Sequence, residues 1–228
     1  MHPESVYEAV LFDVDDTLCR YRRSADEVLA AAFEQVGVEP YFGQAEYHDR
    51  YPEFVDDTED VRELRRECFA AISADAGCDP ELGRAVARAF AAERDHSNVE
   101  PLPGALEAVD RLARDHRVGV VTNGAPAMQK AKLRGLGLTD AFETVVHAGY
   151  DAQAKPHPEP FERALADLGA TPDQTVHVGN SHASDVTGAH AAGLASAWLA
   201  GEDESGDPAP TYRLRSMREL AEPPWRDY

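Results

Sequence analysis

Phe12-Asp13-Val14-Asp15-Asp16-Thr17-Leu18 is the stretch that decides the fold of this 228-residue chain. The apolar run before it, residues 9–12, predicts a buried strand. A strand that ends at Phe12 carries the next residues past the carboxyl edge of a sheet, where α/β proteins place their ligands. Asp13 and Asp15 would then face one pocket, where one carboxylate can attack phosphorus while the other protonates the leaving oxygen. The simpler interpretation is a turn or helix capped by aspartate, because short Asp-rich motifs also occur by accident.

Three later segments repeat this pattern of polar residues after an apolar run. The strand predicted over 118–122 ends in Thr122 and is followed by Asn123, whose amide, like the Thr122 hydroxyl, can donate hydrogen bonds to phosphate oxygens. Lys155 precedes a helix that Pro158 can open, and the strand predicted over 175–178 is followed by Gly179-Asn180 and then by Asp185.

Each of these residues also has an ordinary interpretation. Thr122 could cap a helix, Lys155 could be an exposed surface charge, and Asp185 could be a charge favoured by a helix dipole. All four segments nevertheless place polar residues at strand ends in a consistent order. Coincidence is therefore the weaker explanation.

The chain resembles the haloacid dehalogenase (HAD) superfamily, in particular its phosphatase branch with a helical cap inserted after the first motif. The resemblance covers nearly the whole sequence and rests on the DxDxT motif at Asp13–Thr17, the strand-end Thr122, Lys155, and the GDxxxxD-like motif at Gly179–Asp185. It implies an α/β fold with a doubly wound parallel-sheet (Rossmann-like) core, formed by residues 1–18 and 99–228. Residues 19–98 would form an all-helical cap.

The same resemblance implies roles for individual residues. Asp13 would be the nucleophile and Asp15 the general acid and base, while Thr122, Asn123 and Lys155 would bind the transferring phosphate. The metal would be Mg²⁺, held by the Asp13 carboxylate, the Asp15 backbone carbonyl, Asn180 and Asp185. The family usually has aspartate where this chain has Asn180, whose amide oxygen can bind a hard cation but brings no charge, so metal affinity or preference is open to change.

The function implied by the resemblance is Mg²⁺-dependent hydrolysis of a small phosphomonoester through an aspartyl-phosphate. Dehalogenases of the superfamily lack the acid two positions after the nucleophile, so Asp15 favours an oxygen leaving group. Phosphoglycolate, sugar phosphates and nucleoside monophosphates are candidate substrates. A phosphomutase that uses the same groups is an alternative, as is a phospho-acceptor or binding protein without turnover.

Periodicity along the chain agrees with a core interrupted by an insertion. Residues 24–98 carry three helical apolar stripes, with Ser24 and Glu27 as a possible capping box and Asp79-Pro80 as a helix start. From Pro101 helices and strands alternate, as a parallel sheet with crossover helices requires. The elements expected there are a helix over 102–112, strands at 118–122, 144–147, 175–178 and 195–199, helices near 126–136, 161–168 and 184–192, and a short strand and helix within 212–220.

Composition limits the partners. The net charge is −20, from 42 acidic and 22 basic residues, and such a surface repels nucleic acid and anionic membranes. The chain has only three lysines, Lys130, Lys132 and Lys155, and this preference for arginine predicts a salt-adapted, halophilic protein. The expected partner is a small phosphorylated metabolite. Oligomeric state is not readable.

The cysteines and a basic cluster complete the sequence evidence. Cys19, Cys68 and Cys78 have no metal-like spacing, and their odd number without a secretory leader favours reduced thiols in the cytoplasm. The arginines at positions 20, 22 and 23 could contact a second anionic group of the substrate or form surface ion pairs.

Overall fold

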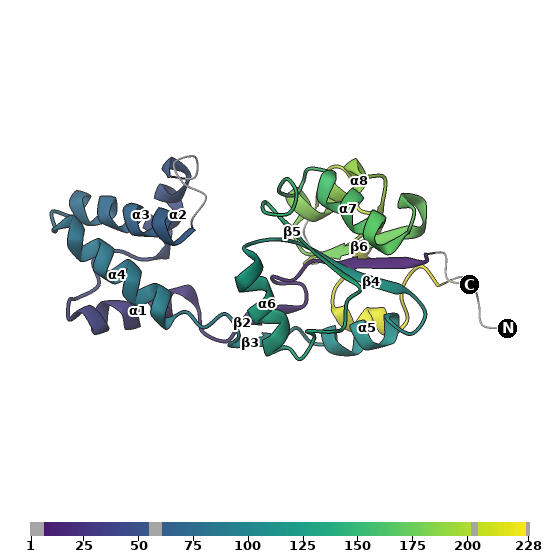
Figure 1. Cartoon of the computed structure of the whole chain (residues 1–228), viewed down its shortest axis with the longest axis horizontal. Helices are drawn as coiled ribbons and strands as arrows, with labels where there is room; N and C mark the ends of the chain where they lie inside the picture. Colours follow the sequence, from purple (N-terminus) through teal and green to yellow (C-terminus); the bar gives the residue numbers. More distant parts are fainter. Residues whose placement is uncertain (1–6, 55–60, 202–204, 227–228) are drawn as a thin grey trace. The chain divides into compact units, whose positions relative to one another are not determined.

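The computed structural model describes residues 7–54, 61–201 and 205–226, and the chain divides into two compact units (Figure 1). The core unit contains residues 1–21 and 96–228, and the inserted unit contains residues 22–95. The chain thus leaves the core unit after residue 21 and returns at residue 96, close to the boundaries at 18 and 99 that the sequence suggested.

The core unit is built on a six-stranded sheet in which every neighbouring pair of strands is parallel. The strand order is β5-β4-β1-β6-β7-β8. The strands are β1 (Ala9–Phe12), β4 (Arg117–Asn123), β5 (Thr144–Ala148), β6 (Thr175–Gly179), β7 (Ala195–Leu199) and β8 (Tyr212–Leu214). The predicted doubly wound parallel α/β core is confirmed. Because the chain runs outward from β1 on one side and then on the other, the carboxyl ends of β4, β1 and β6 border the position where ligands bind in such sheets.

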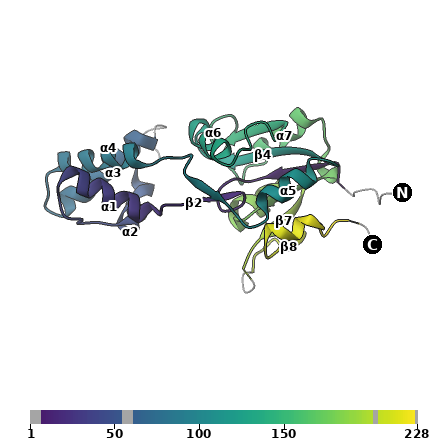
Figure 2. The same ribbon diagram turned by 90° about the horizontal axis from the view of Figure 1, so that it is seen from below.

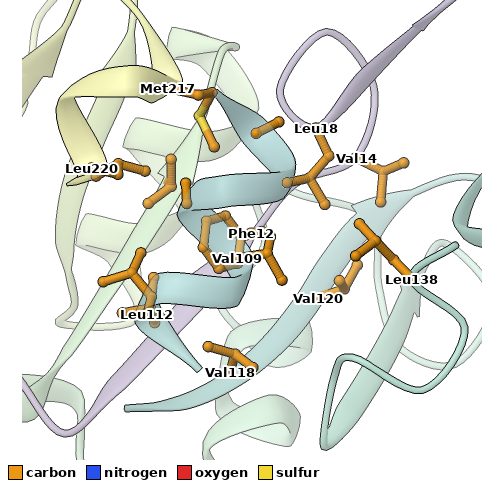
Figure 3. Close-up of a cluster of buried hydrophobic side chains, with 14 of the residues drawn as sticks. Phe12, Val14, Leu18, Val109, Leu112, Val118, Val120, Leu138, Met217 and Leu220 are labelled. Atoms are coloured by element: carbon orange, nitrogen blue, oxygen red, sulfur yellow. The ribbon is translucent and has the colours of Figure 1, made fainter. Parts of the chain in front are cut away.

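Helices cover both faces of this sheet. Val10 and Phe12 of β1 belong to one apolar cluster, together with α5 (Ala105–Leu112) and the C-terminal segment, and Figure 3 shows part of this packing. Ala9 and Leu11 belong to a second cluster with α7 (Glu159–Leu168) and α8 (Thr187–Ala191). Figure 1 shows α5 on the opposite side of the sheet from α7 and α8, and Figure 2 shows the C-terminal segment beside α5. Burial on both faces explains why the central strand β1 is a continuous apolar run.

An antiparallel ribbon of two strands was not predicted. β2 (Cys19–Tyr21) pairs with β3 (Val99–Pro101), and the exposed Arg20 on β2 forms an ion pair with Glu100 at 2.7 Å. The expectation that residues 19–21 open a helical segment was therefore wrong. Strands of three residues are too short to produce a recognisable alternation of polar and apolar side chains.

The inserted unit is helical in its described part. Its α-helices are α1 (Ala25–Val36), α2 (Gln44–Arg50), α3 (Val61–Asp75) and α4 (Pro80–Glu93). Ser24 and Glu27 form the predicted capping box, and Asp79 caps α4. The short α2 was not predicted, because it buries only Tyr47 and so shows no apolar stripe. Within the described residues, none of the helices combines the length and the apolarity needed to span a bilayer.

Candidate active site

The first motif forms a tight turn at the end of β1. The Asp13 amide donates to the Val178 carbonyl at 2.9 Å, which continues the pairing of β1 with β6 by one residue. The Val14 carbonyl then accepts from the Leu18 amide at 2.9 Å. Asp16 has a φ of 53°, in the left-handed region that aspartate adopts more readily than most residues. This turn brings the Thr17 hydroxyl to 3.5 Å from Asp13 Oδ2.

Lys155 lies at the centre of the site. Its Nζ donates to Asp13 Oδ1 at 2.8 Å, to Asp185 Oδ1 at 2.6 Å and to the Val121 carbonyl at 2.8 Å. An ammonium group has three protons, so these three acceptors use all of them. The side chain is only 1% exposed, which excludes the interpretation of Lys155 as a surface charge. Residues from the ends of β1 and β4 and from the segment after β6 therefore meet at one buried cation.

Asp185 is held by three donors. Besides Lys155, its Oδ1 accepts from His177 Nε2 at 3.0 Å, and its Oδ2 accepts from the Ser181 amide at 2.9 Å. The carboxylate stands in a π-helical turn, His182–Val186, that precedes α8, where the sequence predicted one helix over 184–192. Gly179 allows this approach, because an added Cβ would lie 2.6 Å from the Cβ of Asp185.

The pKa values of the two carboxylates that share Lys155 are shifted in opposite directions. Burial raises the pKa of Asp13, despite the attraction of Lys155, and the nearby Asp185 charge adds to that rise. Burial alone would also raise the pKa of Asp185, but Lys155 and His177 outweigh it and hold that pKa below its usual range. Asp185 is therefore the permanent negative partner of Lys155, whereas the charge on Asp13 depends more strongly on what else binds beside it.

Two oxygen atoms face the same weak donor on the other side of Asp13. Asp13 Oδ2 and Asn180 Oδ1 lie 3.5 Å and 3.3 Å from Thr17 Oγ1, which has one proton to give. The Asn180 backbone is fixed by Trp198, whose Nε1 donates to its carbonyl at 2.8 Å. Because Asp13 Oδ2 and Asn180 Oδ1 share a single donor at long distance, the space beside these two oxygens is the candidate cation position.

The oxygen donors here fit Mg²⁺, which prefers carboxylate, carbonyl and amide oxygens. Within the described ranges no group of three or more His, Cys, Asp or Glu side chains could hold a metal ion. The oxygens that the structure places beside this position are those of Asp13 and Asn180.

Thr122 and Asn123 stand at the end of β4 with different surroundings. The Thr122 hydroxyl is buried and has no hydrogen-bond partner among the described residues. Asn123 is engaged: its Nδ2 donates to the Lys155 carbonyl at 3.1 Å, and its Oδ1 accepts from the Lys155 amide at 2.8 Å. The structure thus leaves the hydroxyl without a partner among the described residues and uses the amide to fix the backbone of Lys155.

Asp15 lies apart from this network and has its own partners. Lys132 Nζ donates to Asp15 Oδ1 at 2.6 Å and to Oδ2 at 2.7 Å, and Gln129 Nε2 donates to Oδ2 at 2.9 Å. Both donors come from α6 (Pro126–Gly135), one turn apart. Burial opposes the charge on Lys132, but Asp15 outweighs that effect and raises the pKa of the lysine.

Neither Lys132 nor Gln129 was predicted from the sequence. A signal for Lys132 existed, because the chain has only three lysines and each of them is therefore conspicuous, as Lys155 was. Gln129 and Lys132 are three residues apart in the predicted helix, so both side chains lie on the same helix face.

The basic cluster after the first motif is paired. Arg20 bonds Glu100, and Arg23 bonds Glu93 within the inserted unit. A cavity of about 460 Å³ lies in the core unit, lined by Asp16, Asn180 and Arg215 among others. This volume lies within the range of about 300–1,000 Å³ that is usual for small-molecule sites.

Comparison with known proteins gives consistent matches. Residues 7–193 match the family model described as haloacid dehalogenase-like hydrolase. The chain is 33% identical over 159 residues to a phosphoserine phosphatase of Thermus thermophilus, and this alignment covers 69% of the chain and 64% of that relative, less than two thirds of its length. It is 29% identical over 225 residues to a glyceraldehyde 3-phosphate phosphatase of Methanopyrus kandleri, covering 93% of the chain and 95% of that relative.

Solved structures show the same fold. The HAD hydrolase YfnB of Bacillus subtilis superimposes with a TM-score of 0.74 at 24% sequence identity, covering 95% of this chain and 97% of that one.

Proposed function

The chain belongs to the haloacid dehalogenase-like hydrolases, and we propose that it is a Mg²⁺-dependent phosphatase that hydrolyses a small phosphomonoester through an aspartyl-phosphate. The observation that carries this proposal is the buried Lys155, which holds Asp13 beside Asp185 at the ends of the central strands. The named activities of the two relatives, both phosphatases of small metabolites, support the same reaction class.

In the first step Asp13 acts as the nucleophile. A carboxylate oxygen of Asp13 forms a bond to phosphorus, the bond from phosphorus to the ester oxygen breaks, and Asp15 gives its proton to the departing alcohol. Lys155 offsets the negative charge on the transferring group, and the unpaired hydroxyl of Thr122 can donate to one of its oxygens. Asn123 supports this step by holding the Lys155 backbone.

In the second step water replaces Asp13. Asp15, now a carboxylate, takes a proton from the water as the water oxygen bonds to phosphorus, and the bond from phosphorus to Asp13 breaks. Phosphate leaves, and Asp13 and Asp15 return to their starting forms. Several groups must cooperate, because a positioned base contributes about 10²–10⁴-fold whereas unaided monoester hydrolysis needs up to about 10²¹-fold.

The residues that would hold Mg²⁺ are Asp13 through Oδ2, Asp15 through its backbone carbonyl, and Asn180 through Oδ1. Asp185, which the sequence pattern placed among the ligands, is already bonded by three donors. We therefore assign it to holding Lys155. When bound, the cation supplies positive charge to the phosphate oxygens and keeps the Asp13 carboxylate ionised.

Substitution of Asp13 by asparagine tests the proposal. The variant should lose about 10⁴-fold or more of the Mg²⁺-dependent turnover of 4-nitrophenyl phosphate while its thermal unfolding midpoint stays near that of the wild type. Full turnover by a folded Asp13→Asn protein would refute the assignment. Free phosphate measured against isomerised sugar phosphate separates a phosphatase from a phosphomutase, and a single labelling event without turnover would indicate a phospho-acceptor.

The substrate and the environment belong to the same proposal. The named activities of the relatives support a small phosphorylated metabolite as the substrate, and a cavity of about 460 Å³ lies beside Asn180. The acidic, lysine-poor composition supports a halophilic protein of the cytoplasm, and this stays a prediction.

A further inference from the structure

The salt bridge of Asp15 is unusual in the burial of its two partners. The side chain of Lys132 is 3% exposed, whereas that of Asp15 is 42% exposed. The cation is therefore enclosed by protein while the carboxylate keeps an open side. Such an arrangement fixes the carboxylate from behind and leaves its front available to a ligand.

The cost of burying Lys132 is offset mainly by its contacts with Asp15. Removing an ammonium group from water costs several kcal/mol unless an opposite charge compensates. Both hydrogen bonds from Nζ within the described part of the chain go to Asp15. The Tyr21 ring lies 5.0 Å from Nζ and adds a favourable cation–π contact.

Gln129 gives a second, independent indication. Its Nε2 donates to Asp15, but its Oε1 is buried and has no partner among the described residues. A buried polar atom without a partner destabilises the fold, because it has given up its hydrogen bonds to water. An apolar side chain of similar size would avoid that cost, so stability alone does not explain glutamine at this position.

We propose that Lys132 and Gln129 are positioning residues that hold the Asp15 carboxylate in the orientation from which it exchanges protons with the leaving oxygen and with water. This inference rests on the proposed function. Oδ2 accepts from both residues whereas Oδ1 accepts from Lys132 alone, so Oδ1 has the more open side and is the oxygen that carries the exchanged proton. The alcohol receives that proton in the first step, and water returns it in the second.

A positioning role predicts a dependence on the leaving group that a purely structural role would not produce. The rate constant kcat/KM reports the steps up to departure of the alcohol, and a poor leaving group needs its proton more than a good one. We expect Lys132→Met to lower kcat/KM for phenyl phosphate by about 10²-fold, the lower end of the usual contribution of a general acid. For 4-nitrophenyl phosphate the loss should be at least about tenfold smaller, because nitrophenolate leaves readily without a proton.

The same helix offers a matched control. Lys130→Met removes an exposed lysine two residues away, and kcat/KM for both substrates should stay within a factor of about 3 of the wild type. Gln129→Leu should show the leaving-group dependence of Lys132→Met with a smaller loss, and it provides the test if Lys132→Met does not fold. The double variant Asp15→Asn/Lys132→Met should be no slower than Asp15→Asn alone.

The possible failures are distinguishable. If the wild type and Asp15→Asn show the expected difference between the two substrates but Lys132→Met and Gln129→Leu slow both equally, the inference is overturned and the proposed function stands. Additive losses in the double variant would overturn it as well. If the wild type turns over neither phosphate ester in the presence of Mg²⁺, the proposed function itself fails.

Discussion

Replacement of Gly179 by alanine tests whether Asp185 controls the position of Lys155, which the proposed mechanism uses to offset the charge of the transferring phosphate. An added Cβ would lie 2.5 Å from Asp185 Oδ2 and 2.6 Å from Asp185 Cβ, whereas non-bonded carbon atoms settle about 3.5–4.0 Å apart. The carboxylate must therefore move by about 1 Å. Asp185 Oδ1 is 2.6 Å from Lys155 Nζ, which is 2.8 Å from Asp13 Oδ1, so the movement reaches the proposed nucleophile.

The magnitudes follow from that displacement. Overpacking of this kind costs about 1–3 kcal/mol, which lowers the unfolding midpoint of a chain of this size by about 2–12 °C. A misplacement of about 1 Å in a catalytic group costs about 10²-fold in rate. We therefore expect Gly179→Ala to lower kcat/KM by about 10²-fold, equivalent to about 2.7 kcal/mol of transition-state stabilisation.

The assay is kcat/KM for 4-nitrophenyl phosphate with saturating Mg²⁺, at a temperature well below the unfolding midpoint of each variant. Gly83→Ala is the matched control, because an added Cβ there would lie 2.6 Å from the Phe69 carbonyl carbon. That clash lies inside the inserted unit and leaves Asp185 in place. The reasoning is refuted if Gly179→Ala is less stable but within about threefold of wild-type activity, or if Gly83→Ala loses as much activity.

Three further predictions concern the metal, pH and salt. Asn180→Asp adds a carboxylate beside Asp13 Oδ2, so the Mg²⁺ concentration for half-maximal activity should fall by about tenfold or more. The reason is that one added negative charge in contact with the cation contributes more than about 1 kcal/mol to its binding. An unchanged Mg²⁺ requirement would contradict this prediction. Burial lowers the pKa of His116, so the unfolded chain binds a proton near pH 6.5 that the folded chain resists. Stability is therefore lost as pH falls through that value, and His116→Asn should lose less stability than the wild type between pH 7.5 and 5.5 in parallel urea titrations. The unfolding midpoint should rise between dilute and molar KCl if self-repulsion of the net charge of −20 limits stability, and a flat response would exclude that cause.

The elements that the sequence predicted well are those buried on both sides. β1 and β6 are short runs of buried, mostly apolar side chains bounded by polar residues, and such runs are hard to mistake when turn and helix signals flank them. The polar residues after each run were placed together by the same argument, since parallel strands end at one edge of the sheet. Lys155 lies beside these residues, because its ammonium group bonds Asp13, Val121 and Asp185 at the same edge of the sheet.

The parts that escaped prediction depend on contacts between distant segments or on very short elements. β2 pairs with β3 across the whole insertion, and no local pattern reports such a partner. In the π-helical turn at His182–Val186 the Asp185 carboxylate accepts from the Ser181 amide and from Lys155, and periodicity cannot reveal such contacts. The pairing of Asp15 with α6 is likewise set by the crossover of the chain between β4 and β5.

The distribution of the three lysines supports placing the chemistry at the end of β1. Lys155 is buried and forms an ion pair with Asp13, and Lys132 is buried and forms one with Asp15, whereas Lys130 is exposed. A compact ammonium with three donors fits these enclosed positions, which a planar guanidinium would not. In a chain that uses arginine elsewhere, lysine therefore persists mainly where its geometry is needed.

The same groups set the charge that a substrate would meet. In the form that begins the proposed reaction Asp15 carries a proton, so Asp13 and Asp185 carry two negative charges that the ammonium groups of Lys132 and Lys155 balance. A divalent cation would leave two net positive charges, which attract a phosphate dianion although the protein as a whole is strongly acidic. An aspartate in place of Asn180 would remove one of those charges. The amide therefore weakens the hold on the metal but leaves the loaded site more attractive to phosphate, so Asn180→Asp should tighten Mg²⁺ binding and raise the KM for the ester.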